Sequence, residues 1–273
     1  MKKFFALILA CLFVISLVAC TEAKKTTAAQ TKTAAASKEE TKPATEETKP
    51  AVTDEVKVMS HDEYVAAAID SKVTVETCVQ AKQGWWEDNG VGQASVYTQA
   101  EDGAYFLYNL PCSKEDYDKL TVGTRIRVTG TKAEWSGEVE IIEATYEIVD
   151  GSFIAQPEDV TALLGTDELI KHQNELVAFK GMTVEAKKDA DGNDVAFLYK
   201  YNGSGEEGDD LYFAVSLNGQ TYNFTVESYL CGPETEVYKA VKALKVGDKI
   251  DMTGFLYWYE GANPHITSVT PAA

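Results

Sequence analysis

A strand motif that contains two glycines occurs twice in the chain and constrains its fold more than any other feature. The first copy runs from Tyr117 as YDKLTVGTRIRVTG, and the second runs from Tyr238 as YKAVKALKVGDKIDMTG. In both copies a helical segment ends at a leucine, a Val-Gly pair follows, and alternating apolar and polar residues lead to Thr-Gly. Such alternation is typical of a strand with one buried face, and a glycine inside a strand suits a bulge. We therefore expect a small, curled sheet in each half of the chain.

The residues before each copy extend the repeat to a whole domain. Ahead of the first copy, the pattern predicts strands over Val73 to Lys82, Ala94 to Gln99 and Ala104 to Leu110, followed by a short helix over 113–120. Three strands, a helix and two strands is the order of the five-stranded Greek-key barrel called the OB-fold. Matching segments precede the second copy. A Ser60-to-Glu63 capping box also predicts a short helix ahead of the first strand.

On these motifs, the sequence resembles the OB-fold modules found in tandem in uncharacterised bacterial surface lipoproteins. The resemblance implies a mainly β fold with two tandem five-stranded OB-fold Greek-key barrels, each with a short capping helix. We place the first barrel at 56–151 and the second at 159–273, with Pro157 in the short connection between them.

The N-terminal segment predicts export and lipid attachment. Residues 1–19 combine a basic start, an apolar run and Leu17-Val18-Ala19 directly before Cys20, which together form a lipoprotein signal peptide. The apolar run is shorter than the ~20 residues that a membrane-spanning helix needs. Residues 20–55 consist mostly of Thr, Ala, Lys, Glu and Pro, a composition that predicts a disordered tether. We expect a protein on the extracytoplasmic face of the cell membrane, anchored through acyl chains on Cys20.

Charge argues against a nucleic-acid partner. The formal net charge is −18, with 43 acidic residues against 25 basic ones. Affinity for phosphate chains comes largely from Lys and Arg, so this balance predicts no nucleic-acid binding even for an OB-fold. The only two arginines, Arg125 and Arg127, lie on one predicted strand with no acidic motif beside them that would complete a nuclease site.

Cysteine, histidine and acidic residues give no clear catalytic or metal motif. Cys78 and Cys112 allow a disulfide, but Cys231 has no partner in the second copy, which favours buried thiols. The three histidines lack ligand spacing, so we expect neither a metal site nor an enzyme. The acidic turn over 189–194 departs from a calcium loop at its sixth and twelfth positions and predicts a hairpin tip. Weak calcium binding at such acidic loops remains an alternative, and no other cofactor is expected.

Aromatic residues of the first domain supply the candidate binding site. OB-folds hold ligands on the face of their second and third strands and on the loops after strand one and between strands four and five. We expect Phe106 and Tyr108 to cover the barrel core, and at least one of the adjacent tryptophans to be exposed. The expected ligand-binding residues are Trp85, Trp86, Tyr97, Tyr105 and Trp135.

Three classes of function follow from these features. The first is a non-enzymatic binding module for a glycan, a basic peptide or a small cationic ligand, because exposed indoles and carboxylates suit sugar faces and positive groups. The second is a structural or assembly lipoprotein that contacts other envelope proteins. The third is an enzyme, for which the sequence offers no catalytic constellation, and an OB-fold nucleic-acid binder or nuclease is disfavoured by charge.

The anchor can be tested directly. Replacing Cys20→Ala removes the thiol to which the acyl chains would attach, and we expect the variant to be lost from the membrane fraction or to stay unprocessed. Each buried methylene of an acyl chain contributes about 0.8 kcal/mol to membrane affinity. Cell fractionation decides, because a processed Cys20→Ala chain that stays in the membrane contradicts lipid anchoring.

Overall fold

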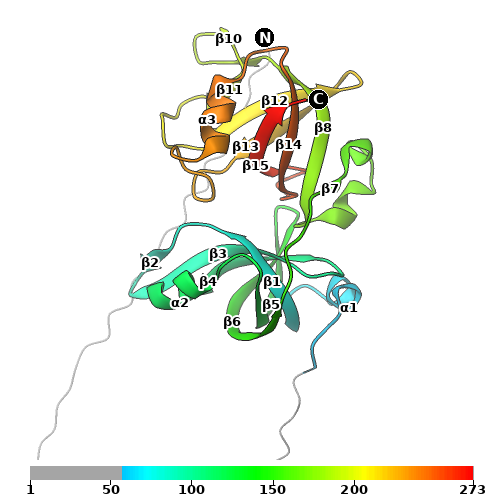
Figure 1. Cartoon of the computed structure of the whole chain (residues 1–273), viewed down its shortest axis with the longest axis vertical. Helices are drawn as coiled ribbons and strands as arrows, with labels where there is room; N and C mark the ends of the chain where they lie inside the picture. The colour runs from blue at the N-terminus through cyan, green and yellow to red at the C-terminus, as the bar shows by residue number, and fades with distance from the viewer. Residues whose placement is uncertain (1–56, 273) are drawn as a thin grey trace, which may run out of the picture. The chain divides into compact units, whose positions relative to one another are not determined.

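A computed structural model describes residues 57–272, and within them the fold is mainly β (Figure 1). The predicted signal peptide, Cys20 and the whole predicted tether lie outside the described residues. By their internal contacts the described residues belong to one compact unit. Among the described helices, none combines the length and the apolar character needed to cross a membrane.

The first half of the described chain forms one sheet with two short helices. Its elements are α1 (His61–Ala66), β1 (Lys72–Lys82), β2 (Trp86–Asp88), β3 (Val91–Gln99), β4 (Ala104–Pro111), α2 (Lys114–Lys119), β5 (Thr124–Trp135) and β6 (Glu138–Ser152).

These strands close into a five-stranded barrel. The hydrogen-bonded order is β1-β5-β6-β4-β3-β2, and β1 also pairs with β3, so the ring closes while β2 extends from β3. All described pairings are antiparallel except that of β4 with β6, which is parallel. The helix α2 lies in the chain between β4 and β5, as the sequence predicted. Inside the barrel, a cluster that includes Val75, Leu107, Ile126 and Ile141 is fully buried.

The second half contributes a longer set of shorter elements. They are β7 (Glu158–Asp159), η1 (Thr161–Leu163), η2 (Leu169–His172), β8 (Leu176–Glu185), β9 (Lys187–Lys188), β10 (Asp194–Val195), β11 (Phe197–Tyr199), β12 (Leu211–Leu217), β13 (Gln220–Val226), α3 (Glu236–Ala243), β14 (Lys249–Phe255) and β15 (His265–Pro271).

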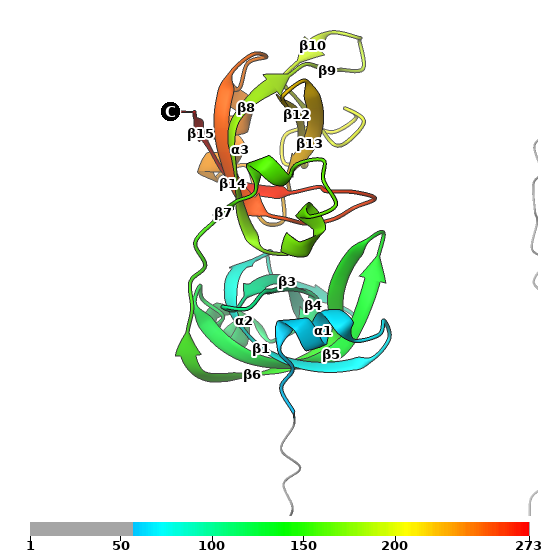
Figure 2. The same cartoon turned by 90° about the vertical axis from the view of Figure 1, so that its right-hand side faces the viewer.

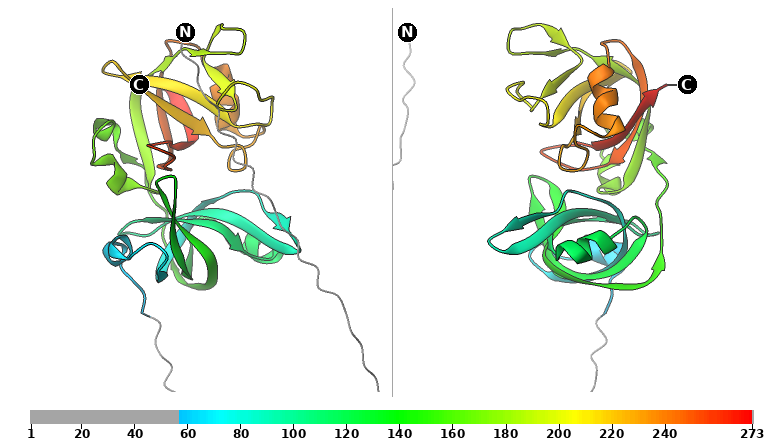
Figure 3. Two further views of the ribbon diagram at one scale, coloured as in Figure 1. Left: turned by 180° about the vertical axis from the view of Figure 1, so that it is seen from behind. Right: turned by 60° about the vertical axis from the view of Figure 1, so that its left-hand side comes forward.

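The second sheet has the order β11-β12-β13-β15-β14-β8-β7, with a further pairing of β12 with β8. Its strands β8, β12, β13, β14 and β15 therefore pair in the same sequence as β1, β3, β4, β5 and β6, and β13 pairs in parallel with β15. Figure 3 shows α3 alongside this sheet. The helix begins at its cap Thr235 and packs Val237, Tyr238 and Val241 into the core.

The capping box predicted at Ser60 is confirmed and starts α1. The Ser60 side chain accepts a hydrogen bond from Glu63 N, and the Glu63 carboxylate accepts one from Ser60 N. The other end of α1 is bound by Lys132 of β5, whose ammonium donates to the carbonyls of Tyr64, Val65 and Ala67 at 2.8–2.9 Å. These bonds explain how a lysine is buried here and why α1 lies beside β1 and β5 (Figure 2).

The two arginines have acidic partners that the sequence did not indicate. On β5, Arg127 donates to Glu76 of β1 and to Glu147 of β6, and Arg125 forms an ion pair with Glu76. The register of the sheet places these residues opposite one another, because Glu76 faces Arg127 directly. The arginine charges are thus matched within the sheet.

The strand glycines of the repeat lie at the predicted bulges. The register shifts between Thr129 and Thr131 in the first sheet, and between Thr253 and Gly254 in the second. A β-carbon on Gly130 would come within 2.5 Å of the Ile141 side chain, and one on Gly254 within 2.3 Å of the His265 carbonyl oxygen. Glycine is required at both places because neighbouring strand atoms occupy the space of a side chain.

We expect Gly254→Ala to lower the free energy of unfolding by about 1–3 kcal/mol, the usual cost of overpacking. The new methyl group would meet backbone atoms of β15, which cannot move aside without breaking the ladder. Gly84→Ala is the matched control, since its β-carbon would lie 4.0 Å from the nearest atom. Denaturant unfolding of both variants gives the comparison, and equal stabilities would contradict the close-approach argument.

Candidate functional site

The predicted ligand face of the first barrel is covered by residues of the second sheet. The Tyr97 side chain is 0% exposed, and its ring stacks on Phe255 with 4.5 Å between ring centroids. Its hydroxyl lies 2.6 Å from His265 Nδ1. The prediction that Tyr97 contacts a ligand is therefore wrong, because Phe255 packs against its ring and His265 contacts its hydroxyl.

The next strand shows how alternation divides the neighbouring aromatic residues. Tyr105 points into the barrel core, where its ring meets the edge of Tyr64 at 4.9 Å, so Tyr105 also cannot bind a ligand from solvent. Phe106 is buried beside Tyr97 and Phe255, as expected of a core residue. Tyr108 is 47% exposed, so the expectation that it covers the core is wrong.

The adjacent tryptophans lie apart from the remaining predicted site residue. Trp85 is half-buried, donates from Nε1 to the Cys112 carbonyl at 3.0 Å, and covers Gly92. Trp86 is 45% exposed on β2, in line with the expectation that one indole stays exposed. Trp85 lines a shallow surface pocket, whereas Trp135 lines a different and larger one. The five predicted aromatic residues thus do not form one site.

The larger pocket is a cleft of about 850 Å³ with several aromatic rings. Trp135 and Tyr259 are both about half-exposed, and their ring centroids lie 5.2 Å apart. The lining residues are aromatic (Trp135, Tyr201, Tyr212, Tyr257, Tyr259, His265), acidic (Asp210, Glu227, Glu260), amide-bearing (Asn223, Asn263), the base Lys187, and Gly261 with Ala262.

Two corresponding hairpins form one part of the cleft. Trp135 ends β5 immediately before a tight turn in which Ser136 and Gly137 both have positive φ. Tyr259 lies in the hairpin that joins β14 to β15, and the next residue, Glu260, donates from its backbone N–H to the Ser136 carbonyl at 2.7 Å. Gly137 leaves room for the Trp258 ring, which a β-carbon would approach within 2.7 Å. This direct contact between turns holds Trp135 and Tyr259 together.

Two titratable groups of the cleft, Glu227 and His265, have pKa values shifted toward their neutral forms. Burial raises the pKa of Glu227 to about 7, and its carboxyl group accepts hydrogen bonds from Tyr229 N, Leu230 N and the Gln83 side chain. Burial lowers the pKa of His265 to about 3, so this imidazole is neutral. The His265 ring stacks on Tyr257 with 4.3 Å between ring centroids, and its Nδ1 is hydrogen-bonded to the Tyr97 hydroxyl.

A second buried carboxyl group lies next to the cleft. Glu138 is 0% exposed and accepts hydrogen bonds from Trp258 N at 2.8 Å and from the Gln173 side chain at 3.1 Å. Burial raises its pKa to about 8, outweighing those hydrogen bonds. Among the described residues, Glu138 Oε1 and Asn174 Oδ1 have no hydrogen-bond partner. When protonated, Glu138 carries an O–H donor that a carboxylate lacks.

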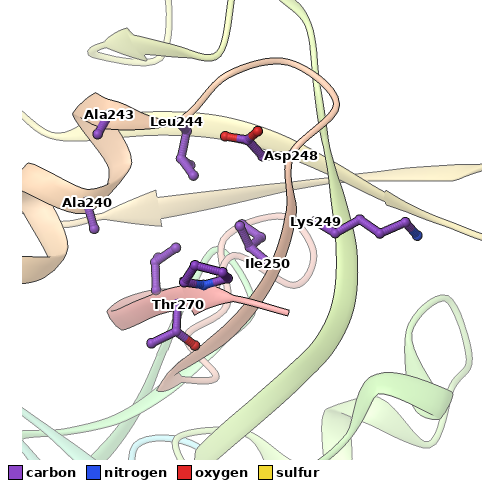
Figure 4. A pocket seen from close by; sticks show the side chains of 9 residues that line it. Ala240, Ala243, Leu244, Asp248, Lys249, Ile250 and Thr270 are labelled. Atoms are coloured by element: carbon purple, nitrogen blue, oxygen red, sulfur yellow. The ribbon is translucent and has the colours of Figure 1, made fainter. Parts of the chain in front are cut away.

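A smaller depression of about 310 Å³ lies between α3 and the β14–β15 pair. Figure 4 shows Ala240, Ala243, Leu244 and Ile250 around it, with the Lys249 side chain directed away from them. It has neither an aromatic ring nor a buried polar group among its lining residues. The cleft at Trp135 and Tyr259 is therefore the better candidate for specific recognition.

Residues 57–272 contain three cysteines and one cluster of metal-ligand side chains. The cysteines Cys78, Cys112 and Cys231 are free and buried, as the thiol interpretation predicted. The acidic turn is a hairpin tip, in which the Asp189 carboxylate accepts from the backbone N–H groups of Asp191 and Asn193. One group with metal-ligand chemistry does form, and it consists of Glu158, His172 and Glu175. The three-residue spacing from His172 to Glu175 was visible in the sequence, but the approach of Glu158 was not.

Comparisons with known proteins find no family. No protein-family model matches the chain, and no curated protein matches it. Among solved structures, a murine DNA-binding protein bound to double-stranded DNA is 13% identical, with a TM-score of 0.35, over 73% of this chain and 96% of that one. The Ifi202 HINa domain with a 20-bp double-stranded DNA is 12% identical, with a TM-score of 0.33, over 76% and 99%. A replication protein A heterotrimer bound to single-stranded DNA is 11% identical, with a TM-score of 0.28, over 74% and 49%.

These neighbours differ from the functional prediction made from composition. Each was solved with DNA, whereas the sequence predicted a protein with no nucleic-acid partner. The predicted binding module for a glycan, basic peptide or cationic ligand on the aromatic face is wrong, and the burial of Tyr97 and Tyr105 gives the physical reason. At these TM-scores and identities, the likeness assigns no ligand to this chain.

The protonation of Glu138 generates a test of stability against pH. Its pKa rises from 4.5 to about 8 on folding, so its contribution is complete below about pH 4.5 and is lost as pH rises through about 8. At full ionisation the loss is roughly 3–5 kcal/mol, taking about 1.4 kcal/mol for each pKa unit. Glu138→Gln keeps the acceptor for Trp258 N and replaces the acid proton by an amide donor.

We expect the Gln variant to become more stable than the natural protein as pH rises from about 5 to 9, in a series of denaturant titrations. Glu134→Gln, on the exposed side of the same hairpin, is the control and should leave the pH profile unchanged. Parallel pH profiles for the natural protein and Glu138→Gln would show that Glu138 is ionised in the fold.

Proposed function

We propose that this protein binds nucleobase-containing ligands and that the base enters the cleft and stacks on an exposed face of the Trp135–Tyr259 ring pair. The observation that carries the proposal is the meeting of two corresponding hairpins, which places two half-exposed rings 5.2 Å apart in a cleft of about 850 Å³. Aromatic side chains bind bases by stacking, because every base has a π-face. The cleft volume is within the range of small-molecule sites.

The fold supports this choice at the level of architecture. We propose that the second sheet is also an OB-fold barrel and that the two barrels stand in tandem, since β8 and β12–β15 pair in the order of the first barrel. OB-folds use the loop between their fourth and fifth strands for ligands. Here that loop of the first barrel carries Trp135 and that of the second carries Tyr259, so both would serve one cleft.

The polar lining favours the base over the phosphate. Amide and carboxylate groups hydrogen-bond the edges of bases, as Asn does with adenine and Asp or Glu with the cytosine amino group. Asn223, Asn263 and Asp210 supply such groups in the cleft. The cleft is lined by one basic side chain, Lys187, and by three acidic ones. Phosphate groups would therefore add little binding free energy here.

We further propose that the protein works at the outer face of the cell membrane, held by lipid on Cys20, because of its signal-peptide motif. The two ligand sources with this chemistry are free nucleosides and the bases of single-stranded nucleic acid. Binding is proposed in place of catalysis, since the His265 imidazole that lines the cleft is already engaged by Tyr97.

Titration of the indole fluorescence of the full chain with adenosine, cytidine and a single-stranded oligonucleotide tests the proposal. We expect Trp135→Ala and Tyr259→Ala each to weaken binding roughly 5- to 100-fold, because stacking one base is worth about 1–3 kcal/mol. Trp86→Ala removes an exposed indole outside the cleft and should change nothing. The affinity should vary little between about 50 and 200 mM salt, unlike phosphate-driven binding.

The arms of this experiment separate the outcomes. Binding of nucleosides alone identifies a free metabolite, and oligonucleotide binding that depends on Trp135 identifies single strands. Oligonucleotide binding with a steep salt dependence and no effect of Trp135→Ala would place the contact elsewhere and overturn the proposal. Binding of a neutral oligosaccharide in the absence of any nucleoside response would do the same.

A further inference from the structure

Three side chains with metal-ligand chemistry converge at the start of the second sheet. Glu158 comes from β7, His172 from the end of η2, and Glu175 directly precedes β8. His172 Nδ1 lies 2.8 Å from Glu175 Oε2 and 3.7 Å from Glu158 Oε2. The ligand atoms of all three lie within 4.8 Å of one another.

The backbone fixes all three positions. Glu158 pairs with Val177 in the parallel β7–β8 ladder, which sets its distance from the residues just before β8. Glu175 N donates to the His172 carbonyl at 3.0 Å, and the intervening Asn174 donates from its backbone N–H to the Leu256 carbonyl at 2.9 Å. The three side chains therefore meet because of hydrogen bonds that do not involve the side chains themselves.

The charge of this group is not balanced by a basic residue. Within residues 57–272, neither Glu158 nor Glu175 forms an ion pair with Lys or Arg, and the neighbouring Lys171 pairs with Glu168. In the first sheet, by contrast, the converging carboxylates of Glu76 and Glu147 are both paired with Arg127. Two carboxylates facing a single imidazole leave an excess of negative charge at a fixed place, which a divalent cation would neutralise.

We propose that Glu158, His172 and Glu175 bind a divalent transition-metal ion, with zinc as the best fit. One imidazole nitrogen and two carboxylate oxygens match zinc ligation, whereas calcium and magnesium prefer oxygen ligands throughout. Metal–ligand distances of about 2.0–2.2 Å place tetrahedral ligand atoms roughly 3.3–3.6 Å apart, so the 2.8 Å contact would widen slightly on binding.

One side of the proposed site faces solvent. His172 and Glu175 are half-buried, but the Glu158 side chain is 62% exposed. Three protein ligands with an open side are the arrangement in which zinc keeps a water or an external ligand in its fourth position. None of the three residues lines the Trp135 cleft, so the metal-site proposal does not depend on the proposal of base binding.

Calorimetric titration of the full chain with zinc chloride gives the first test. We expect one ion per chain, a loss of at least tenfold in affinity for His172→Ala and for Glu175→Gln, and no change for His61→Ala, a half-buried histidine outside the group. Glu158→Gln alters the most exposed ligand and keeps the measurement valid if the other variants fold poorly. Thermal unfolding without metal establishes which variants are folded.

Cobalt(II) supplies a second, spectroscopic test on the same chain. Cobalt bound by one nitrogen and two oxygens gives visible d–d bands without a sulfur-to-metal charge-transfer band. A charge-transfer band would assign the metal to a cysteine and overturn the proposal. Zinc binding that His172→Ala and Glu158→Gln both leave unchanged would overturn it as well.

Discussion

The packing of Tyr97 against Phe255 and His265 joins the two sheets and determines which surfaces of the folded unit stay exposed. The Tyr97 ring stacks on Phe255 and its hydroxyl meets the neutral imidazole of His265, so one side chain of the first sheet is enclosed by two of the second. A phenol can be buried at small cost when its ring packs and its hydroxyl has a partner. This contact covers the barrel face that the sequence had assigned to a ligand, and it leaves the late hairpins as the exposed aromatic surface.

Buried acids surround this contact. Glu138, Glu140 and Glu227 all have raised pKa values, of about 8, 7 and 7, and burial is the main cause in each case. A carboxylate is costly to bury unless donors surround it, and a protonated acid is less so. The contacts of Glu138 with Trp258 N and of Glu227 with Gln83 join the two sheets, so the protonation of these acids and the attachment between the sheets are physically linked.

Local patterns predicted the elements of the fold well, because their causes are local. The alternation in TRIRVTG and the glycine at its end gave β5 and its bulge, and the capping box gave α1. Alternation along β4 likewise put Tyr105 and Phe106 on opposite faces of the sheet. It could not say which of the two faces met the barrel core, since that depends on where the second sheet packs. The candidate site failed for the same reason, because Tyr97 is buried by Phe255 and His265, which lie more than one hundred residues away.

The contact between the turns that carry Trp135 and Tyr259 could not be predicted from the repeat. Trp135 and Tyr259 lie in corresponding turns of the two sheets, and the repeat predicted each turn only within its own half of the chain. The hydrogen bond from Glu260 N to the Ser136 carbonyl joins them, and the φ angles of Ser136 and Gly137 make that carbonyl available. Because each turn belongs to a different sheet, a ligand in the cleft that touches both Trp135 and Tyr259 would contact both sheets at once. Its binding would then depend on the same junction that Tyr97 and Glu138 hold together, which ties recognition in the cleft to the packing beneath it.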